Sequence, residues 1–125
     1  MQRLVLIVDD SDQLAATLEV ALSGQPDLSV LLARDGLEAL QVLENRADVR
    51  ALVTDLQMPR MDGFELIGRV RADGRLAGLP IIAISGDTDP RTPARAREIG
   101  ADAFFGKPFS PAGLCAKLAR LIDSQ

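Results

Sequence analysis

The chain has 125 residues, of which 47% are apolar and 26% charged, and this is typical of a single globular domain. Acidic residues number 18 and basic residues 14, and the resulting net charge of −4 argues against non-specific nucleic-acid binding. Histidine is absent and cysteine occurs once, which excludes phosphohistidine chemistry, Ser-His-Asp catalysis, an internal disulfide and a cysteine zinc site within this chain.

The first apolar run, residues 4–8, is five residues long and is followed by two aspartates. A signal peptide needs a longer apolar core, and a membrane-spanning helix needs about 20 apolar residues. We therefore expect a cytoplasmic protein that has no membrane partner.

Short apolar runs recur along the chain, several of them rich in β-branched residues. They lie at residues 4–8, 28–32, 51–53, 81–84 and 103–105. Most lack the alternation of apolar and polar residues that marks a strand with one solvated face. Continuous apolar strands favour a parallel sheet that is covered on both faces.

Amphipathic segments with helical periodicity separate these runs. Apolar residues recur with this period after Ser11, and residues 37–43 and 64–70 show it too. Thr92-Pro93 and Ser110-Pro111 are each typical of an N-cap followed by proline at the first helical position. We expect Ser11, Thr92 and Ser110 to cap helices. Five βα units then make residues 1–125 one doubly wound α/β domain.

Polar residues follow four of the five predicted strands. Asp9 and Asp10 follow the first, Asp55 follows the third, Ser85 the fourth and Lys107 the fifth. Ligands of an open parallel sheet bind at the carboxyl ends of its strands, so these side chains are expected at one edge. The second strand ends in residues 33–36, to which we assign no catalytic part. Each residue alone has an ordinary explanation as a turn, a cap or a surface charge, but their combination favours a site.

Three carboxylates in a small cleft repel one another unless a cation lies among them. Mg²⁺ suits such a cleft, since it takes one or two carboxylates and completes its shell with waters and phosphate oxygens. Asp55 is placed to accept a phosphoryl group as an acyl phosphate, with Lys107 and the hydroxyl of Ser85 as partners for the new oxygens. Mn²⁺ is the alternative cation.

Five motifs support this interpretation over almost the whole chain. They are VDD at 8–10, DGLEAL at 35–40, TDLQMPRMDGFEL at 54–66, PIIAISG at 80–86 and GADAFFGKPF at 100–109. With these motifs in this order, the sequence resembles the receiver domain of bacterial two-component response regulators, in particular the chemotaxis regulators. The resemblance implies a flavodoxin-like sheet of order 2-1-3-4-5 with five flanking helices. It also implies phosphotransfer from a histidine kinase or a phosphotransfer protein.

The resemblance implies a role for each matching residue. Asp55 is the expected phosphoacceptor, and the expected Mg²⁺ ligands are Asp9, Asp10, Asp55 and the backbone carbonyl of Gln57. Ser85 and Lys107 are expected to contact the phosphoryl group. Pro108 is expected to follow a cis peptide bond, and Phe104 to act with Ser85 as the aromatic switch residue. Many members carry Tyr at that position, so a contact through its hydroxyl is lost here.

Nothing follows the fifth predicted helix, so we expect no DNA-binding or catalytic output domain and no direct contact with nucleic acid. The resemblance implies output through the face of helix 4, strand 5 and helix 5. Basic residues of that region, which fit an acidic protein target or simply a solvated surface, are Arg91, Arg95, Arg97, Lys117 and Arg120. A monomer or a weak phosphorylation-dependent dimer is expected.

Other functions fit the sequence less well. A phosphorylation-independent binding module of the same fold is the alternative, although every expected site residue is present. An aspartate-nucleophile phosphohydrolase usually has a second Asp two residues after the nucleophile, where this chain has Gln57. No glycine-rich phosphate loop is present for a nucleotide or flavin. We therefore expect a phosphorylation-controlled switch, which takes up and loses its own phosphoryl group, and not an enzyme with an external substrate.

Overall fold

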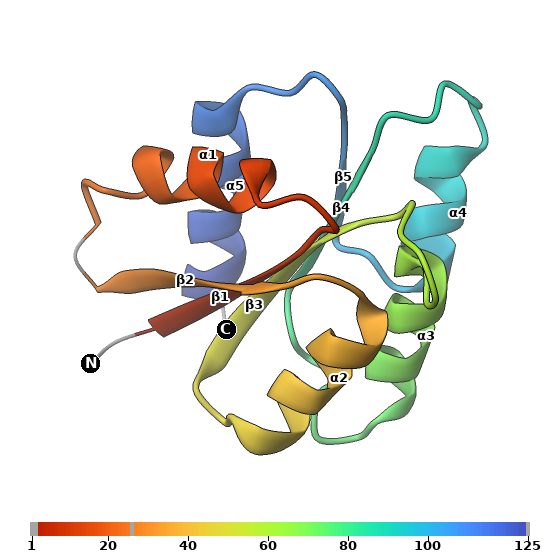
Figure 1. Cartoon of the computed structure of the whole chain (residues 1–125), viewed down its shortest axis with the longest axis horizontal. Coiled ribbons are helices and arrows are strands. Elements are labelled where there is room, and N and C mark those ends of the chain that lie inside the picture. Colours follow the sequence, from red (N-terminus) through yellow and green to blue (C-terminus); the bar gives the residue numbers. More distant parts are fainter. Residues whose placement is uncertain (1–2, 26, 125) are drawn as a thin grey trace.

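Strands and helices alternate along the chain in the computed structural model, which describes residues 3–25 and 27–124 (Figure 1). The described residues form β1 (Arg3–Val8), α1 (Gln13–Ala21), β2 (Leu28–Ala33), α2 (Gly36–Asn45), β3 (Val49–Asp55), α3 (Gly63–Ala72), β4 (Ile81–Ser85), α4 (Thr92–Ile99), β5 (Ala103–Gly106) and α5 (Pro111–Asp123).

The strands form one parallel sheet of order β2-β1-β3-β4-β5. This is the flavodoxin-like α/β arrangement, so the predicted fold and strand order are confirmed. β1 lies between β2 and β3, and its last residue, Val8, is paired with Ala33 on one side and Thr54 on the other. At the same edge Asp55 is paired with Ile84, and Ser85 with Gly106. The strand ends that carry the predicted site residues therefore lie side by side.

Helices cover both faces of the sheet and divide its apolar side chains into two clusters. α2, α3 and α4 lie on one face, and α1 and α5 lie on the other (Figure 1). Successive residues of a strand point to opposite faces, so Leu6 packs in the first cluster and Ile7 in the second. Because both faces are buried, β1 is apolar at every position from Leu4 to Val8.

Element lengths differ little from those predicted. β3 begins at Val49, two residues before the predicted run, because Val49 pairs with Leu4 of β1 while the side chain of Arg50 stays in solvent. α5 is 13 residues long.

Among residues 3–25 and 27–124, no helix is both long and apolar enough to cross a membrane.

Side chains at the helix N-termini confirm one predicted cap. The Oγ of Ser110 accepts a hydrogen bond from the backbone N–H of Gly113 at 3.0 Å, and proline occupies the first position of α5. Asp35 and Asp62 cap α2 and α3 in the same way, by accepting from the N–H groups of Glu38 and Glu65.

Two predicted caps were wrong. At α1 the N-cap residue is Asp12, not Ser11, and its side chain makes no capping hydrogen bond. Ser11 lies one residue before the cap, and its Oγ accepts from the N–H of Gln13, the first residue of the helix. Thr92 lies inside α4, where its buried hydroxyl donates to Asp87 Oδ2 at 3.0 Å. A carboxylate is a stronger acceptor for a buried hydroxyl than a helical N–H group is a donor to it, so the hydroxyl faces Asp87.

Candidate phosphorylation site

The carboxyl edge of the sheet brings together four of the predicted site residues. Asp9, Asp10, Asp55 and Lys107 line one cavity of about 390 Å³. Asp9 and Asp10 follow β1, Asp55 ends β3, and Lys107 follows β5. The fold thus converts three positions that are far apart in the sequence into one acidic cavity with a lysine in it.

Asp55 is held by both of its carboxylate oxygens. Its Oδ1 accepts a hydrogen bond from the backbone N–H of Gln57 at 2.9 Å, and its Oδ2 accepts from Lys107 Nζ at 2.7 Å. The residue is only 4% exposed. A carboxylate fixed in this way presents its oxygens in a defined direction, as a nucleophile requires.

Asp9 shares the same lysine at a longer distance. Its Oδ2 lies 3.9 Å from Lys107 Nζ, and its Oδ1 accepts from the N–H of Ser11. Burial raises the pKa of Asp9, and the nearby carboxyl groups of Asp10 and Asp55 add to this rise. Burial lowers the pKa of Lys107, but its hydrogen bond to Asp55 and the surrounding negative charge outweigh burial, and the net pKa is raised. The three carboxylates that line this cavity therefore carry more negative charge than Lys107 can balance.

The donor set fits a divalent cation held in an open site. Among the described residues no group of three or more acidic, cysteine or histidine side chains is placed so that it could hold a metal ion by itself. Asp9 and Asp55 are buried, whereas Asp10 is exposed at the mouth of the cavity. Mg²⁺ binds proteins through one or two carboxylates and keeps several waters, so an incomplete cage with excess negative charge is suited to it.

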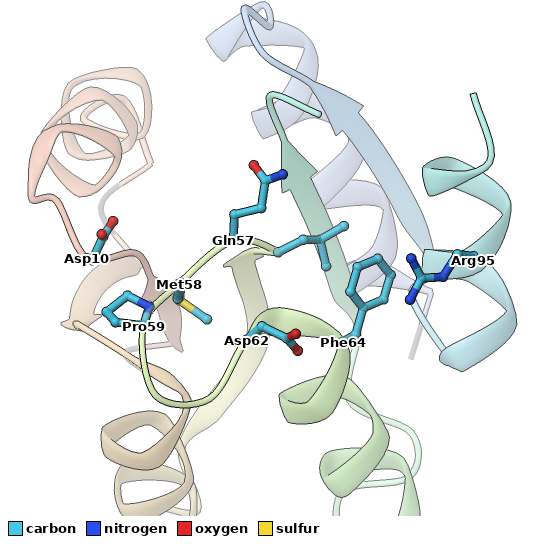
Figure 2. Close-up of a pocket in the computed structure, with 8 residues that line it drawn as sticks. Asp10, Gln57, Met58, Pro59, Asp62, Phe64 and Arg95 are labelled. Atoms are coloured by element: carbon cyan, nitrogen blue, oxygen red, sulfur yellow. The ribbon is translucent and has the colours of Figure 1, made fainter. Parts of the chain in front are cut away.

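A second cavity of about 550 Å³ adjoins the first and is lined by Asp10 and by the loop that follows β3. Figure 2 shows Gln57 and Pro59 on this loop, with Asp10 on a separate segment across from them. On the other side of the cavity Arg95 of α4 lies 4.3 Å from the centre of the Phe64 ring of α3. Gln57 thus donates its N–H to Asp55 and lines the same cavity as the exposed Asp10.

Neither Ser85 nor Phe104 forms a hydrogen bond with Asp55 among the described residues. Ser85 is buried at the end of β4, and its Oγ accepts from the N–H of Asp87 at 2.9 Å. The half-buried Phe104 packs against the core cluster under α2, α3 and α4. The Lys107–Pro108 peptide bond is cis. The structure therefore joins Asp9 and Asp55 to the lysine, whereas the Ser85 hydroxyl is hydrogen-bonded to Asp87 and the Phe104 ring packs against the core.

The sequence analysis missed one charged pair beside the site. Asp35, to which no part was assigned, is buried and forms an ion pair with Arg60, a residue 25 positions later in the loop between β3 and α3. The DG pair at 35–36 signals a helix start but gives no indication of this partner.

Comparison with known proteins agrees with this geometry. The family model of the response regulator receiver domain matches residues 5–119. The chain belongs to this family. It is therefore a signalling domain and not an enzyme that turns over an external substrate.

Relatives of known name match nearly the full chain. Chemotaxis protein CheY1 of Helicobacter pylori strain J99 is 37% identical over 120 residues, which cover 96% of this chain and 97% of that protein. The CheY homolog of Campylobacter jejuni strain 81-176 is 34% identical, with 96% and 92% covered. The solved structure of chemotaxis protein CheY4 of Vibrio cholerae superposes with a TM-score of 0.85 at 30% identity, covering 97% of this chain and 99% of that one. This receiver is thus CheY-like in sequence and in fold.

Proposed function

We propose that this receiver accepts a phosphoryl group on Asp55 from a phosphohistidine of a histidine kinase or phosphotransfer protein. The observation that carries the proposal is the contact of 2.7 Å between Lys107 Nζ and Asp55 Oδ2, inside a cavity that Asp9 and Asp10 also line. A buried carboxylate paired with a lysine and surrounded by further acids suits a group that must gain negative charge during the reaction.

The transfer needs only a nucleophile and charge neutralisation. A carboxylate oxygen of Asp55 attacks the phosphorus of the donor. The O–P bond forms as the P–N bond of the phosphohistidine breaks, and the bonding electrons stay on the imidazole nitrogen, which takes a proton from solvent. Lys107, already within hydrogen-bond distance of Asp55, then pairs with the oxygens of the acyl phosphate.

Asp9, Asp10, Asp55 and the backbone carbonyl of Gln57 would hold Mg²⁺. When bound, the ion neutralises the carboxylates and the incoming phosphoryl oxygens. Support comes from the charge of the cavity, in which three carboxylates face one lysine. The pKa of Asp9 is raised mainly by burial, and the carboxyl groups of Asp10 and Asp55 add to the rise.

Phosphorylation would be transmitted through Ser85 and Phe104 to the face of α4, β5 and α5. Ser85 ends β4 at the carboxyl edge of the sheet, and its hydroxyl would turn from the N–H of Asp87 towards new phosphoryl oxygens. Arg95 and Arg97 of α4 and Arg91, which precedes the helix, are exposed and suit an acidic protein target.

Intact-mass spectrometry after incubation with acetyl phosphate tests the proposal. We expect one phosphoryl adduct that requires Mg²⁺ and is absent from Asp55→Asn, a substitution that keeps the shape of the side chain. Lys107→Gln, in which the cation is lost, should form the adduct much more slowly. If no adduct forms with acetyl phosphate or with a histidine kinase that phosphorylates other receivers, the phosphorylation-independent binding module replaces this proposal.

A further inference from the structure

The loop between β3 and α3 is attached to the start of α2 by an ion pair. Arg60 Nη2 donates to Asp35 Oδ2, while Asp35 Oδ1 accepts from the N–H of Glu38 as the cap of α2. The Asp35 side chain is only 5% exposed and that of Arg60 is 65% exposed. The two oxygens of Asp35 therefore have separate tasks, one in the helix cap and one in the loop.

Arg60 has a left-handed backbone conformation. Its φ of +66° is the only positive φ of a non-glycine residue in residues 3–25 and 27–124. Left-handed backbone is unfavourable for a residue with a Cβ atom, so surrounding contacts must hold it there. The hydrogen bonds of Asp35, first with the N–H of Glu38 and then with Arg60, also keep the pKa of Asp35 below its usual range.

Two further contacts fix the ends of the same loop. Met61 is buried, and its side chain lies so close to Gly36 that a Cβ there would be 2.7 Å from Met61 Sδ. The N–H of Gly63 donates to the carbonyl of Leu56 at 3.1 Å. Residues 57–59 span the interval between these anchors, and Figure 2 shows them along the edge of the cavity that Asp10 lines.

We propose that the Arg60–Asp35 ion pair is a positioning element of the phosphorylation site, which restrains residues 57–59 and so strengthens Mg²⁺ binding. The inference rests on the proposed function, because the carbonyl of Gln57 is one of the proposed ligands. A ligand on a restrained segment loses less conformational freedom on binding, and the ion therefore binds more tightly. Arg60 acts through the loop and touches neither the metal nor the phosphoryl group.

If the ion pair had only a structural role, its loss would affect stability but not Mg²⁺ affinity. If the pair only stabilised the fold, its loss would lower the midpoint of thermal unfolding and leave Mg²⁺ affinity unchanged. Because Asp35 keeps its helix cap when Arg60 is replaced, the substitution separates the loop restraint from the start of α2.

The test compares wild type with Arg60→Gln and Arg60→Lys. Arg69→Gln is the matched control, because Arg69 forms an exposed ion pair with Glu65 on α3. The chain has no Trp or Tyr, so Mg²⁺ affinity is measured by calorimetry, and amide hydrogen exchange of residues 57–61 is followed by NMR without metal. We expect Arg60→Gln to weaken Mg²⁺ binding by about tenfold, the lower end for outer-sphere partners. Exchange in the loop should become faster.

Arg60→Lys should recover most of the affinity, and Arg69→Gln should match wild type. Unchanged affinity and exchange in Arg60→Gln would overturn the inference, as would a loss of thermal stability with Mg²⁺ affinity intact. The wild-type arm separates the two proposals. If wild type neither binds Mg²⁺ nor forms the adduct, the proposed function fails first, whereas a normal wild type with an unaffected Arg60→Gln refutes the positioning role alone.

Discussion

The buried carboxylate of Asp9 destabilises the metal-free protein. Asp9 is buried, its carboxylate is near Asp55, and Lys107 is nearer to Asp55 than to Asp9. We predict that Asp9→Asn raises the midpoint of thermal unfolding of the metal-free protein by about 3 °C at neutral pH. The amide keeps an oxygen for the N–H of Ser11 but removes the charge. The same variant should lose the stabilisation that Mg²⁺ gives wild type, as differential scanning calorimetry can show.

The difference in unfolding free energy between Asp9→Asn and wild type should depend on pH, and the sign of this dependence follows from the pKa of Asp9. Because the pKa of Asp9 is raised above its unfolded value of 3.8, mainly by burial, the native state binds more protons than the unfolded chain in the window between the two. The unfolding free energy of wild type falls as pH rises through that window. Urea denaturation in EDTA should show Asp9→Asn and wild type closest below about pH 4 and furthest apart near neutrality. A difference that is constant over this range would contradict the prediction.

The start of α3 lies close against the end of β3. A Cβ atom on Gly63 would lie 2.4 Å from the carbonyl oxygen of Asp55 and 2.7 Å from Leu56 Cα, both backbone atoms that cannot move aside independently. We predict that Gly63→Ala lowers the unfolding free energy by about 2–3 kcal/mol. It should also slow phosphoryl uptake, because α3 displaces the strand end that carries Asp55.

Gly68 provides the matched control within the same helix. A Cβ there meets only the side chain of Ile99, with Cδ1 at 3.5 Å and Cγ1 at 3.7 Å, which are ordinary contact distances. Alanine is a better helix former than glycine by about 1 kcal/mol, so Gly68→Ala should be neutral or stabilising in urea denaturation. Equal destabilisation by the two substitutions would show that helix propensity, and not the approach to Asp55, decides the outcome.

At the scale of the whole molecule, Arg71 links three parts of the chain at the edge opposite to the site. Its guanidinium donates to the carbonyls of Gly100 and Leu79 at 2.9 and 2.7 Å, and to Asp102 Oδ2 at 3.0 Å. The same Asp102 oxygen accepts from the N–H of Ile81. We predict that Arg71→Leu lowers the unfolding free energy by about 3 kcal/mol in urea denaturation.

Arg97 serves as the control for this prediction, since it is exposed on α4 and has no ion pair among the described residues. Arg97→Leu should change the unfolding free energy by no more than about 0.5 kcal/mol. The rate and extent of phosphoryl uptake at low temperature should be similar in Arg71→Leu and wild type, because Arg71 is remote from Asp55. A selective loss of uptake in the folded variant would show that this edge is coupled to the site.

Local patterns predicted the elements of this fold but not all of its long-range contacts. Continuous apolar residues identified the strands, because both sheet faces are covered. Their order followed from the motifs of the family, since apolar runs alone do not specify neighbours. Thr92 was assigned wrongly because the Thr-Pro pattern carries no information about Asp87, the acceptor that its hydroxyl finds in the fold.

In the candidate site too, the residues at strand ends could be predicted from the sequence, whereas a contact between loops could not. Asp9, Asp55 and Lys107 could be placed together because each directly follows or ends a strand, and parallel strands end at a common edge. The Arg60–Asp35 pair could not be predicted, since it joins two loops and one of its residues, Arg60, has a positive φ. Strand ends are fixed by sheet topology, whereas loop contacts depend on backbone conformations that short motifs do not encode.

β1 lies in the interior of the sheet, although it is the first strand of the sequence. During synthesis it leaves the ribosome before either of its neighbours, and β3, its second neighbour, is complete only at Asp55. A nascent chain that stops before β3 therefore exposes one full hydrogen-bonding edge of an apolar strand, which is prone to pair with other chains. Once residue 55 has emerged and β3 has paired, both hydrogen-bonding edges of β1 are covered, and β1 can no longer pair with another chain.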